Sequence, residues 1–149
     1  MKRLIFLAVL ALTITSCSVT QPLYYWGGEQ KGTSKYENLA YMSYDKQTPE
    51  SLCKLICVYE DMVSHPAGSR LVPPPGICAE YGYLLLQPQT AETFAQNATP
   101  GQKRVFKDAG TDYATWFRMH GEEMMEKEMV LYPESAHFIK PILEKLMQR

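Results

Sequence analysis

Four cysteines are the residues of this chain whose type and spacing point most directly to chemistry. Cys17 closes the tetrad Ile14-Thr15-Ser16-Cys17, in which an aliphatic residue and two small residues precede the cysteine, as in the bacterial lipobox. Small residues let an extended segment enter a signal peptidase, and only a thiol forms a thioether with diacylglycerol. The tetrad therefore predicts cleavage before Cys17 and lipidation of that residue, with fatty acids such as palmitate.

Residues 1–16 have the layout of a secretory signal peptide. Lys2 and Arg3 are followed by an apolar run from Leu4 to Leu12, and small residues come next. The run is about half of the roughly 20 apolar residues that cross a bilayer, so it indicates export rather than anchoring. The alternative is an ordinary signal peptide with a chance cysteine at its end.

Lipid on Cys17 places the rest of the chain at a membrane. Each buried methylene contributes about 0.8 kcal/mol, so two or three acyl chains hold a protein there stably. Ser18 rather than aspartate follows the cysteine, and by analogy with enterobacterial sorting this favours the outer membrane. Because no acidic run follows that would suggest export to the outer surface, we expect a body that faces the periplasm.

The other three cysteines suggest a disulfide or a buried cluster. Cys53 and Cys57 are four residues apart on a predicted helix, so both face one side, and Cys78 begins the next helix. An oxidising periplasm permits one bridge, and antiparallel helices would bring Cys57 nearest to Cys78. That bridge requires Cα atoms within about 7 Å. The alternative is three buried cysteines that pack as small hydrophobic residues.

Histidine and carboxylate spacings do not predict a metal site or a catalytic site. Cys53 and Cys57 lack a zinc spacing even with His65 nearby, and His120 has no second histidine one helical turn away. No hydrolase, phosphate-loop or glycosidase pattern is present, so we predict a protein that is not an enzyme and binds no cofactor. We expect one acidic group to form a solvated helix face: Glu122, Glu123, Glu126 and Glu128.

An aromatic knot follows the lipidated cysteine closely. It consists of Tyr24, Tyr25 and Trp26 and is followed at once by Gly27-Gly28. Tyrosine and tryptophan are typical of membrane headgroup regions and of protein interfaces, so these three residues are candidate partner-binding residues. The alternative is that the rings cover the hydrophobic core of their own domain.

Length and composition predict one folded domain. The chain has 149 residues, of which 46% are hydrophobic and 21% charged, enough for a sizeable core. Its net charge is −1 and no dense basic stretch is present, which disfavours a nucleic-acid partner. We expect a lipidated tether over residues 17–33 and a helical domain over residues 34–149.

Hydrophobic periodicity and capping residues predict helices without any strand of length. The fold class is therefore all-α, a small antiparallel helical domain with a helical insertion. Gly121, in the middle of the longest helix, indicates close approach by another helix. The predicted helices are Ser34 to Tyr44, Pro49 to Ser64, Ile77 to Leu86, two short ones near Ala91–Gln96 and Gln102–Lys107, Tyr113 to Leu131, and Glu134 to Met147, bent at Pro141.

The sequence resembles a family of bacterial lipoproteins known as domain-of-unknown-function family 4810. Four motifs carry the resemblance: Cys17 with Pro22-Leu23-Tyr24-Tyr25-Trp26-Gly27, Pro74-Pro75-Gly76, Ala79-Glu80-Tyr81-Gly82-Tyr83-Leu84 and Leu131-Tyr132-Pro133-Glu134-Ser135. The resemblance implies a single degenerate tetratricopeptide-like helix pair. Gly82 and Gly121 would be its small contact residues and Pro133 the proline that ends the second helix.

Two departures from the tetratricopeptide pattern are visible. Residues 87–112 stand where a repeat has a tight turn, and Glu128 stands where a small residue is expected. A groove for extended peptides, which needs several stacked units, is therefore not implied.

The resemblance also implies partners. Members of the family are typically encoded beside a lipoprotein similar to the curli secretion channel CsgG and beside another uncharacterised lipoprotein. We therefore expect a lipid-anchored accessory of such an envelope complex that binds other envelope lipoproteins. The alternative is a ligand-binding or enzymatic lipoprotein with a site near the cysteines and the insertion 87–112.

Overall fold

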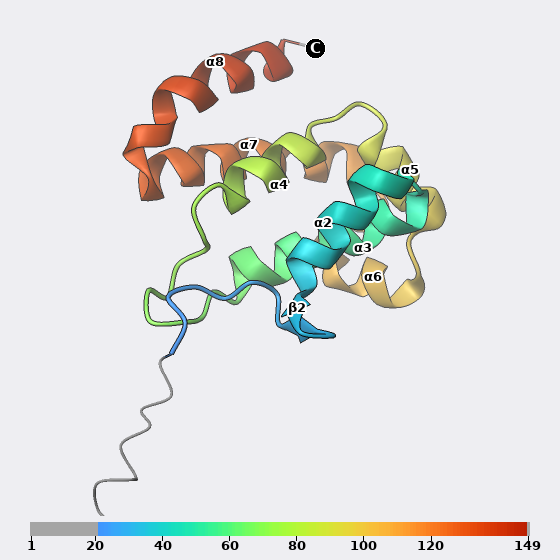
Figure 1. The fold of residues 1–149 in the computed structure, drawn as a ribbon. Coiled ribbons are helices and arrows are strands. Elements are labelled where there is room, and N and C mark those ends of the chain that lie inside the picture. The colour runs from blue at the N-terminus through green and yellow to red at the C-terminus, as the bar shows by residue number, and fades with distance from the viewer. Residues whose placement is uncertain (1–20, 149) are drawn as a thin grey trace, which may run out of the picture.

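A computed structural model shows the arrangement of residues 21–148, which form an almost entirely helical domain (Figure 1). The all-α prediction is confirmed. The elements are β1 (Glu29–Gln30), β2 (Thr33–Ser34), α2 (Lys35–Lys46), α3 (Pro49–Ser64), α4 (Ile77–Leu85), α5 (Thr90–Asn97), α6 (Pro100–Val105), the 3-10 turn η1 (Lys107–Ala109), α7 (Tyr113–Leu131), the 3-10 turn η2 (Pro133–Ser135) and α8 (Ala136–Met147). Among these helices none is long and apolar enough to span a bilayer.

Side-chain caps fix where several helices begin. Ser34, Thr48, Thr99 and Asp112 each accept a hydrogen bond from the backbone N–H three residues later, at the starts of α2, α3, α6 and α7. These bonds satisfy N–H groups that the helix itself leaves free. The predicted starts of α3 and α7 are confirmed because capping is a local property of the sequence.

A glycine contact joins α4 to α7 in the middle of the fold. The two helices run antiparallel, since Cys78 at the start of α4 lies against Glu128 and Leu86 lies against Gly121. A Cβ atom on Gly82 would lie 2.5 Å from the carbonyl oxygen of Gly121. The predicted close approach at Gly121 is confirmed, with Gly82 as its partner.

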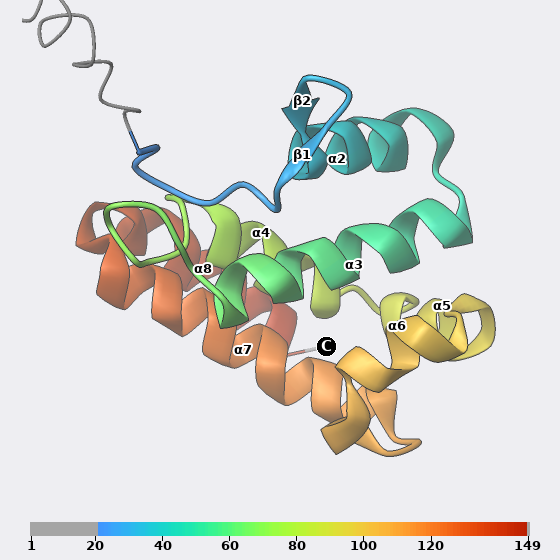
Figure 2. The ribbon, with the colours of Figure 1, turned by 90° about the horizontal axis from the view of Figure 1, so that it is seen from below.

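The insertion between α4 and α7 is part of the core. Phe94 of α5 is fully buried, with its ring 5.1 Å from Phe106 and 5.3 Å from Phe117 of α7. Contacts among these rings join α5 and α6 to α7 at the end of the domain where α7 begins (Figure 2). The insertion therefore extends the hydrophobic core, which the sequence pattern alone did not predict.

The segment before α2 is part of the domain, contrary to the expected tether up to residue 33. The N–H groups of Ser69 and Arg70 donate to the carbonyl oxygens of Pro22 and Leu23 at 3.0 and 3.1 Å. Gly27 is buried, and a Cβ atom there would lie 3.0 Å from Val58 of α3. The segment from Pro22 onward is thus packed on the domain, because backbone groups of a distant loop pair with it.

A short hairpin also lies in this segment, although no strand was predicted. β1 and β2 pair antiparallel, with Glu29 opposite Ser34 and Gln30 opposite Thr33. Lys31 and Gly32 have φ values of 56° and 81°, as a two-residue hairpin turn requires. Strands of two residues are too short to show an alternating pattern in the sequence.

Candidate functional site

The aromatic knot is divided between the core and the surface. Tyr25 packs against the hydrophobic core, and its hydroxyl donates to Asp61 Oδ2 of α3 at 2.8 Å. Burial raises the pKa of Tyr25, and the hydrogen bond to Asp61 raises it further. Tyr25 therefore covers its own domain, which was the alternative stated for the knot.

The other two knot residues occupy different environments. Tyr24 is half-buried beside Tyr132, whose hydroxyl donates to the carbonyl oxygen of Pro73 at 2.6 Å. Trp26 remains 38% exposed, its ring 5.6 Å from that of Tyr36. It borders a surface cavity of about 380 Å³ together with Tyr36 and Ile77. Of the three predicted partner-binding residues, Trp26 presents the most surface.

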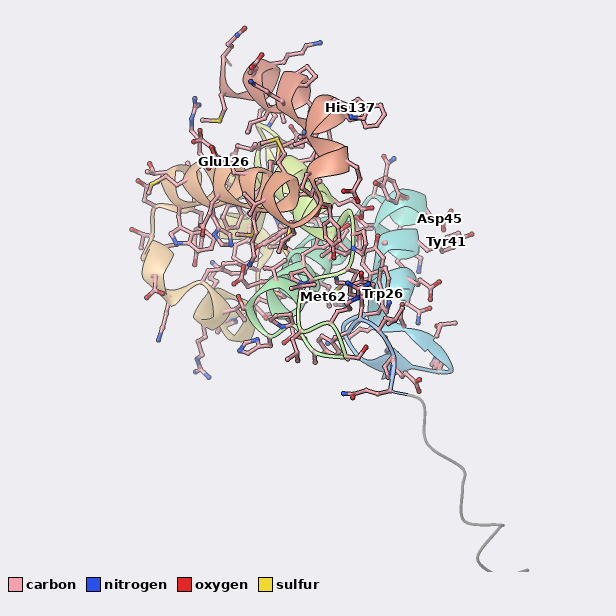
Figure 3. The ribbon with its side chains drawn as sticks, turned by 90° about the vertical axis from the view of Figure 1, so that its left-hand side faces the viewer. Trp26, Tyr41, Asp45, Met62, Glu126 and His137 are labelled. Carbon is pink, nitrogen blue, oxygen red and sulfur yellow. The ribbon has the colours of Figure 1, made fainter. Side chains whose placement is uncertain are left out.

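Tyr25→Phe is expected to lower the free energy of unfolding by about 1 kcal/mol, because the ring stays and one hydrogen bond to a partly exposed carboxylate is lost. Urea unfolding followed by circular dichroism measures this change. The matched control is Tyr41→Phe, because Tyr41 is 73% exposed on the outer side of α2 (Figure 3). Equal stability of the two variants would contradict a structural role for the Tyr25 hydroxyl.

Glu128 corrects the expectation of a solvated acidic face on α7. Its side chain is 1% exposed, and its two carboxylate oxygens accept from the N–H of Gly76 at 2.7 Å and of Cys78 at 3.2 Å. These N–H groups belong to the start of α4, where no side chain of α4 itself caps the helix. Burial raises the pKa of Glu128, and the backbone hydrogen bonds oppose this. The carboxylate caps a neighbouring helix instead of facing water.

Free thiols correct the prediction of a Cys57–Cys78 disulfide. Cys53, Cys57 and Cys78 are all unbridged. Cys57 borders a surface cavity with Lys35 of α2, whereas the backbone of Cys78 binds Glu128 of α7, so the two cysteines meet different neighbours. Burial raises the pKa of both Cys57 and Cys78 to about 12. Because the thiolate is the reactive form, these thiols are poor nucleophiles.

His120 joins a half-buried polar network with Glu60 and Tyr81. Its Nε2 lies 3.1 Å from Glu60 Oε2, and the hydroxyl of Tyr81 donates to the same oxygen at 2.8 Å. Burial opposes ionisation of Glu60, but hydrogen bonds from His120, Ser64 and Tyr81 outweigh it and lower the pKa of Glu60. Within residues 21–148, no three His, Cys, Asp or Glu side chains gather as metal ligands.

A ladder of rings crosses the core, and sequence reasoning missed it. Neighbouring ring centroids are 4.4 to 5.7 Å apart along the series Trp26, Tyr36, Tyr59, Tyr81, His120 and Trp116. Tyr36 and Tyr59 both donate to Glu80 Oε2, at 2.6 and 2.8 Å. The ladder therefore connects the N-terminal segment through α2, α3 and α4 to α7, and its role in this arrangement is structural.

An apolar groove between α2, α4 and α8 is the surface feature best suited to binding. We call it the tyrosine groove; its volume is about 340 Å³. Its exposed large hydrophobic members are Tyr44, Tyr83 and Ile142, at 78%, 50% and 44%. It is lined by Ser43, Tyr44, Leu55, Tyr59, Ala79, Glu80, Tyr83, Leu84, Met125, Ile139 and Ile142. Apolar residues on α4 and α8 indicate an apolar edge in the sequence, but the sequence does not show that α2 completes the groove.

The surface cavities do not include the residues expected in an enzymatic site, namely Cys53, Cys78 and His120. Of five surface cavities with volumes of about 340 to 620 Å³ in the described part of the chain, none is lined by Cys53, Cys78 or His120. The insertion contributes to three of the five: one is bordered by Lys103 and Arg104, and another is bordered by Gln102 together with Cys57.

Comparisons with models of known protein families, with curated proteins and with solved structures give no match for this chain. The resemblance to family 4810 therefore stays a prediction. The lipidation residue Cys17 lies outside the described residues, so its modification also stays a prediction.

Proposed function

We propose that this chain is a lipid-anchored helical interaction module of the bacterial envelope. It is held at the outer membrane through Cys17, faces the periplasm, and serves as an accessory of a CsgG-like secretion or assembly complex. The observation that carries the proposal is the tyrosine groove. Large aromatic side chains in a concave apolar surface are typical of binding hot spots.

The form of the groove supports a protein partner over a reactive substrate. Tyr44, Tyr83 and Ile142 offer apolar area with a polar hydroxyl at the edge, while the one carboxylate of the groove, Glu80, is already engaged by Tyr36 and Tyr59. The carboxylate of the groove is thus occupied in structural hydrogen bonds. A CsgG-like lipoprotein is the partner that the family resemblance implies.

The second candidate function is a ligand-binding or enzymatic lipoprotein with a site near the cysteines and the insertion 87–112. Its best support is the cavity beside Lys103, Arg104 and Lys107, where cations could attract an anionic ligand. That cavity is not lined by any of the cysteines. We therefore place the interaction module first.

Replacing Tyr83 and Ile142 together with serine should reduce co-purification of the CsgG-like lipoprotein at least about tenfold, because central anchors each contribute about 2 kcal/mol. Both side chains are exposed, so the fold should persist. The measurement is affinity purification from detergent-solubilised envelopes of cells that co-express both lipoproteins, with quantitative mass spectrometry.

The control for this experiment is Val105→Ser with Met119→Ser, two apolar side chains of similar exposure, 49% and 67%, outside the groove. This control should retain the partner.

Cys17→Ser should move the protein from the membrane pellet to the soluble fraction. Unchanged sedimentation of Cys17→Ser, or equal partner recovery by the groove and control variants, would contradict the proposal.

A further inference from the structure

A second surface feature lies where the described chain begins. Leu23 and Leu71 are 59% and 68% exposed, so both present most of their apolar side chain to solvent. They come from different parts of the chain, the segment before β1 and the loop between α3 and α4. In both Figure 1 and Figure 2 this loop lies beside the start of the described chain.

Backbone contacts hold these two segments together. The N–H groups of Ser69 and Arg70 donate to the carbonyl oxygens of Pro22 and Leu23. A Cβ atom on Gly68 would lie 2.7 Å from the carbonyl oxygen of Leu23, so glycine is required for this approach. The four exposed neighbours Pro22, Leu23, Arg70 and Leu71 form one surface, which we call the exit face.

Leu71 also has a backbone conformation that is unfavourable for leucine. Its φ is 53°, in the left-handed region that leucine rarely adopts. Such strain persists only where the surroundings impose it and is concentrated at functional positions. Here the strained residue presents a large apolar side chain to solvent next to the arginine Arg70.

The short chain between Cys17 and Leu23 limits how far the exit face can lie from a lipid attached to Cys17. Leu23 follows Cys17 by six residue steps along the chain, a stretch that spans at most about 20 Å when fully extended. A domain of this size has a radius of gyration of about 14 Å, so its diameter exceeds that reach. Acylated Cys17 therefore keeps the exit face toward the bilayer, whatever path residues 18–20 take.

We infer that the exit face docks on the lipid bilayer, with Leu23 and Leu71 entering the interface and Arg70 among the lipid phosphates. This inference rests on the proposed lipid anchor at Cys17. Apolar side chains of peripheral proteins enter the headgroup and acyl boundary by about 5–10 Å, and basic side chains are attracted to anionic lipids. Docking fixes the orientation of the domain and leaves the tyrosine groove open to the periplasm.

Site-specific fluorescence tests the inference on the full acylated protein in vesicles of phosphatidylethanolamine and phosphatidylglycerol. The environment-sensitive fluorophore NBD is attached to cysteine in the variants Leu71→Cys and Leu23→Cys, each with Cys57→Ser. The control position is Met119→Cys, because Met119 is 67% exposed, close to the 68% of Leu71, and lies near Gly121, which packs against the end of α4, whereas the loop precedes the start of α4. Nitroxide-labelled lipids should quench NBD at positions 71 and 23 by about half or more, and leave position 119 nearly unchanged.

The outcomes separate this inference from the proposed function. Quenching at positions 71 and 23 but not 119 supports the docked exit face. Acylated protein that sediments with vesicles but shows equal quenching at all three positions overturns the docking alone. Mass spectrometry that finds Cys17 without lipid, together with protein that stays in the supernatant, overturns both the anchor and the inference.

Discussion

Replacing Gly82 with alanine is expected to destabilise the domain by about 3 kcal/mol and to lower its Tm by about 10 °C. On helix propensity alone, alanine would stabilise α4 by about 1 kcal/mol. Packing makes the expected change in stability unfavourable, because the new methyl group would lie 2.5 Å from the carbonyl oxygen of Gly121 and 2.6 Å from Cγ of Met125. One of these contacts is with backbone, so the two helices must separate to accommodate it.

Gly101→Ala is the matched control for this effect. Gly101 also lies in a helix, α6, but the nearest atom to a Cβ atom there is 3.9 Å away. This substitution should be neutral or slightly stabilising. Thermal unfolding followed by circular dichroism at 222 nm compares the two variants. If Gly82→Ala were as stable as Gly101→Ala, the close contact between α4 and α7 would be wrong.

The features predicted from the sequence were those that depend on neighbouring residues. Thr48 before Pro49 and Asp112 before Tyr113 mark helix starts because a cap acts within one turn. Gly121 indicated a helix contact because a mid-helix glycine needs a compensating reason. These signals were enough for the all-α class and for most helix boundaries.

The features that were missed depend on residues far apart in the chain. The acidic stretch on α7 predicted a solvent-exposed face. Glu128 is buried instead, because it accepts hydrogen bonds from N–H groups at the start of α4, about 50 positions earlier in the chain. Cys57 and Cys78 were expected to meet, but their partners come from α2 and α7. The tyrosine groove likewise needs three helices at once. No periodicity within one element carries that information.

Glu128→Leu is expected to cost about 3 kcal/mol, although it removes a buried charge. Replacing an entire buried ion pair with apolar residues is often neutral or stabilising, because both charged partners are removed together. Here the partners of the carboxylate are the backbone N–H groups of Gly76 and Cys78, which no substitution at 128 removes. Each buried donor left without an acceptor costs about 1–3 kcal/mol, so loss of the acceptor outweighs relief of the charge.

The control for Glu128→Leu is Glu126→Leu, because Glu126 lies on the same helix but is exposed (Figure 3). Urea unfolding should show a loss of stability for Glu128→Leu and a change within about 0.5 kcal/mol for Glu126→Leu. Amide hydrogen exchange should localise the loss, with faster exchange at Cys78 and in the first turn of α4. Wild-type protection of those amides in Glu128→Leu would show that the carboxylate does not cap α4, because capping requires that removal of the acceptor releases the donors.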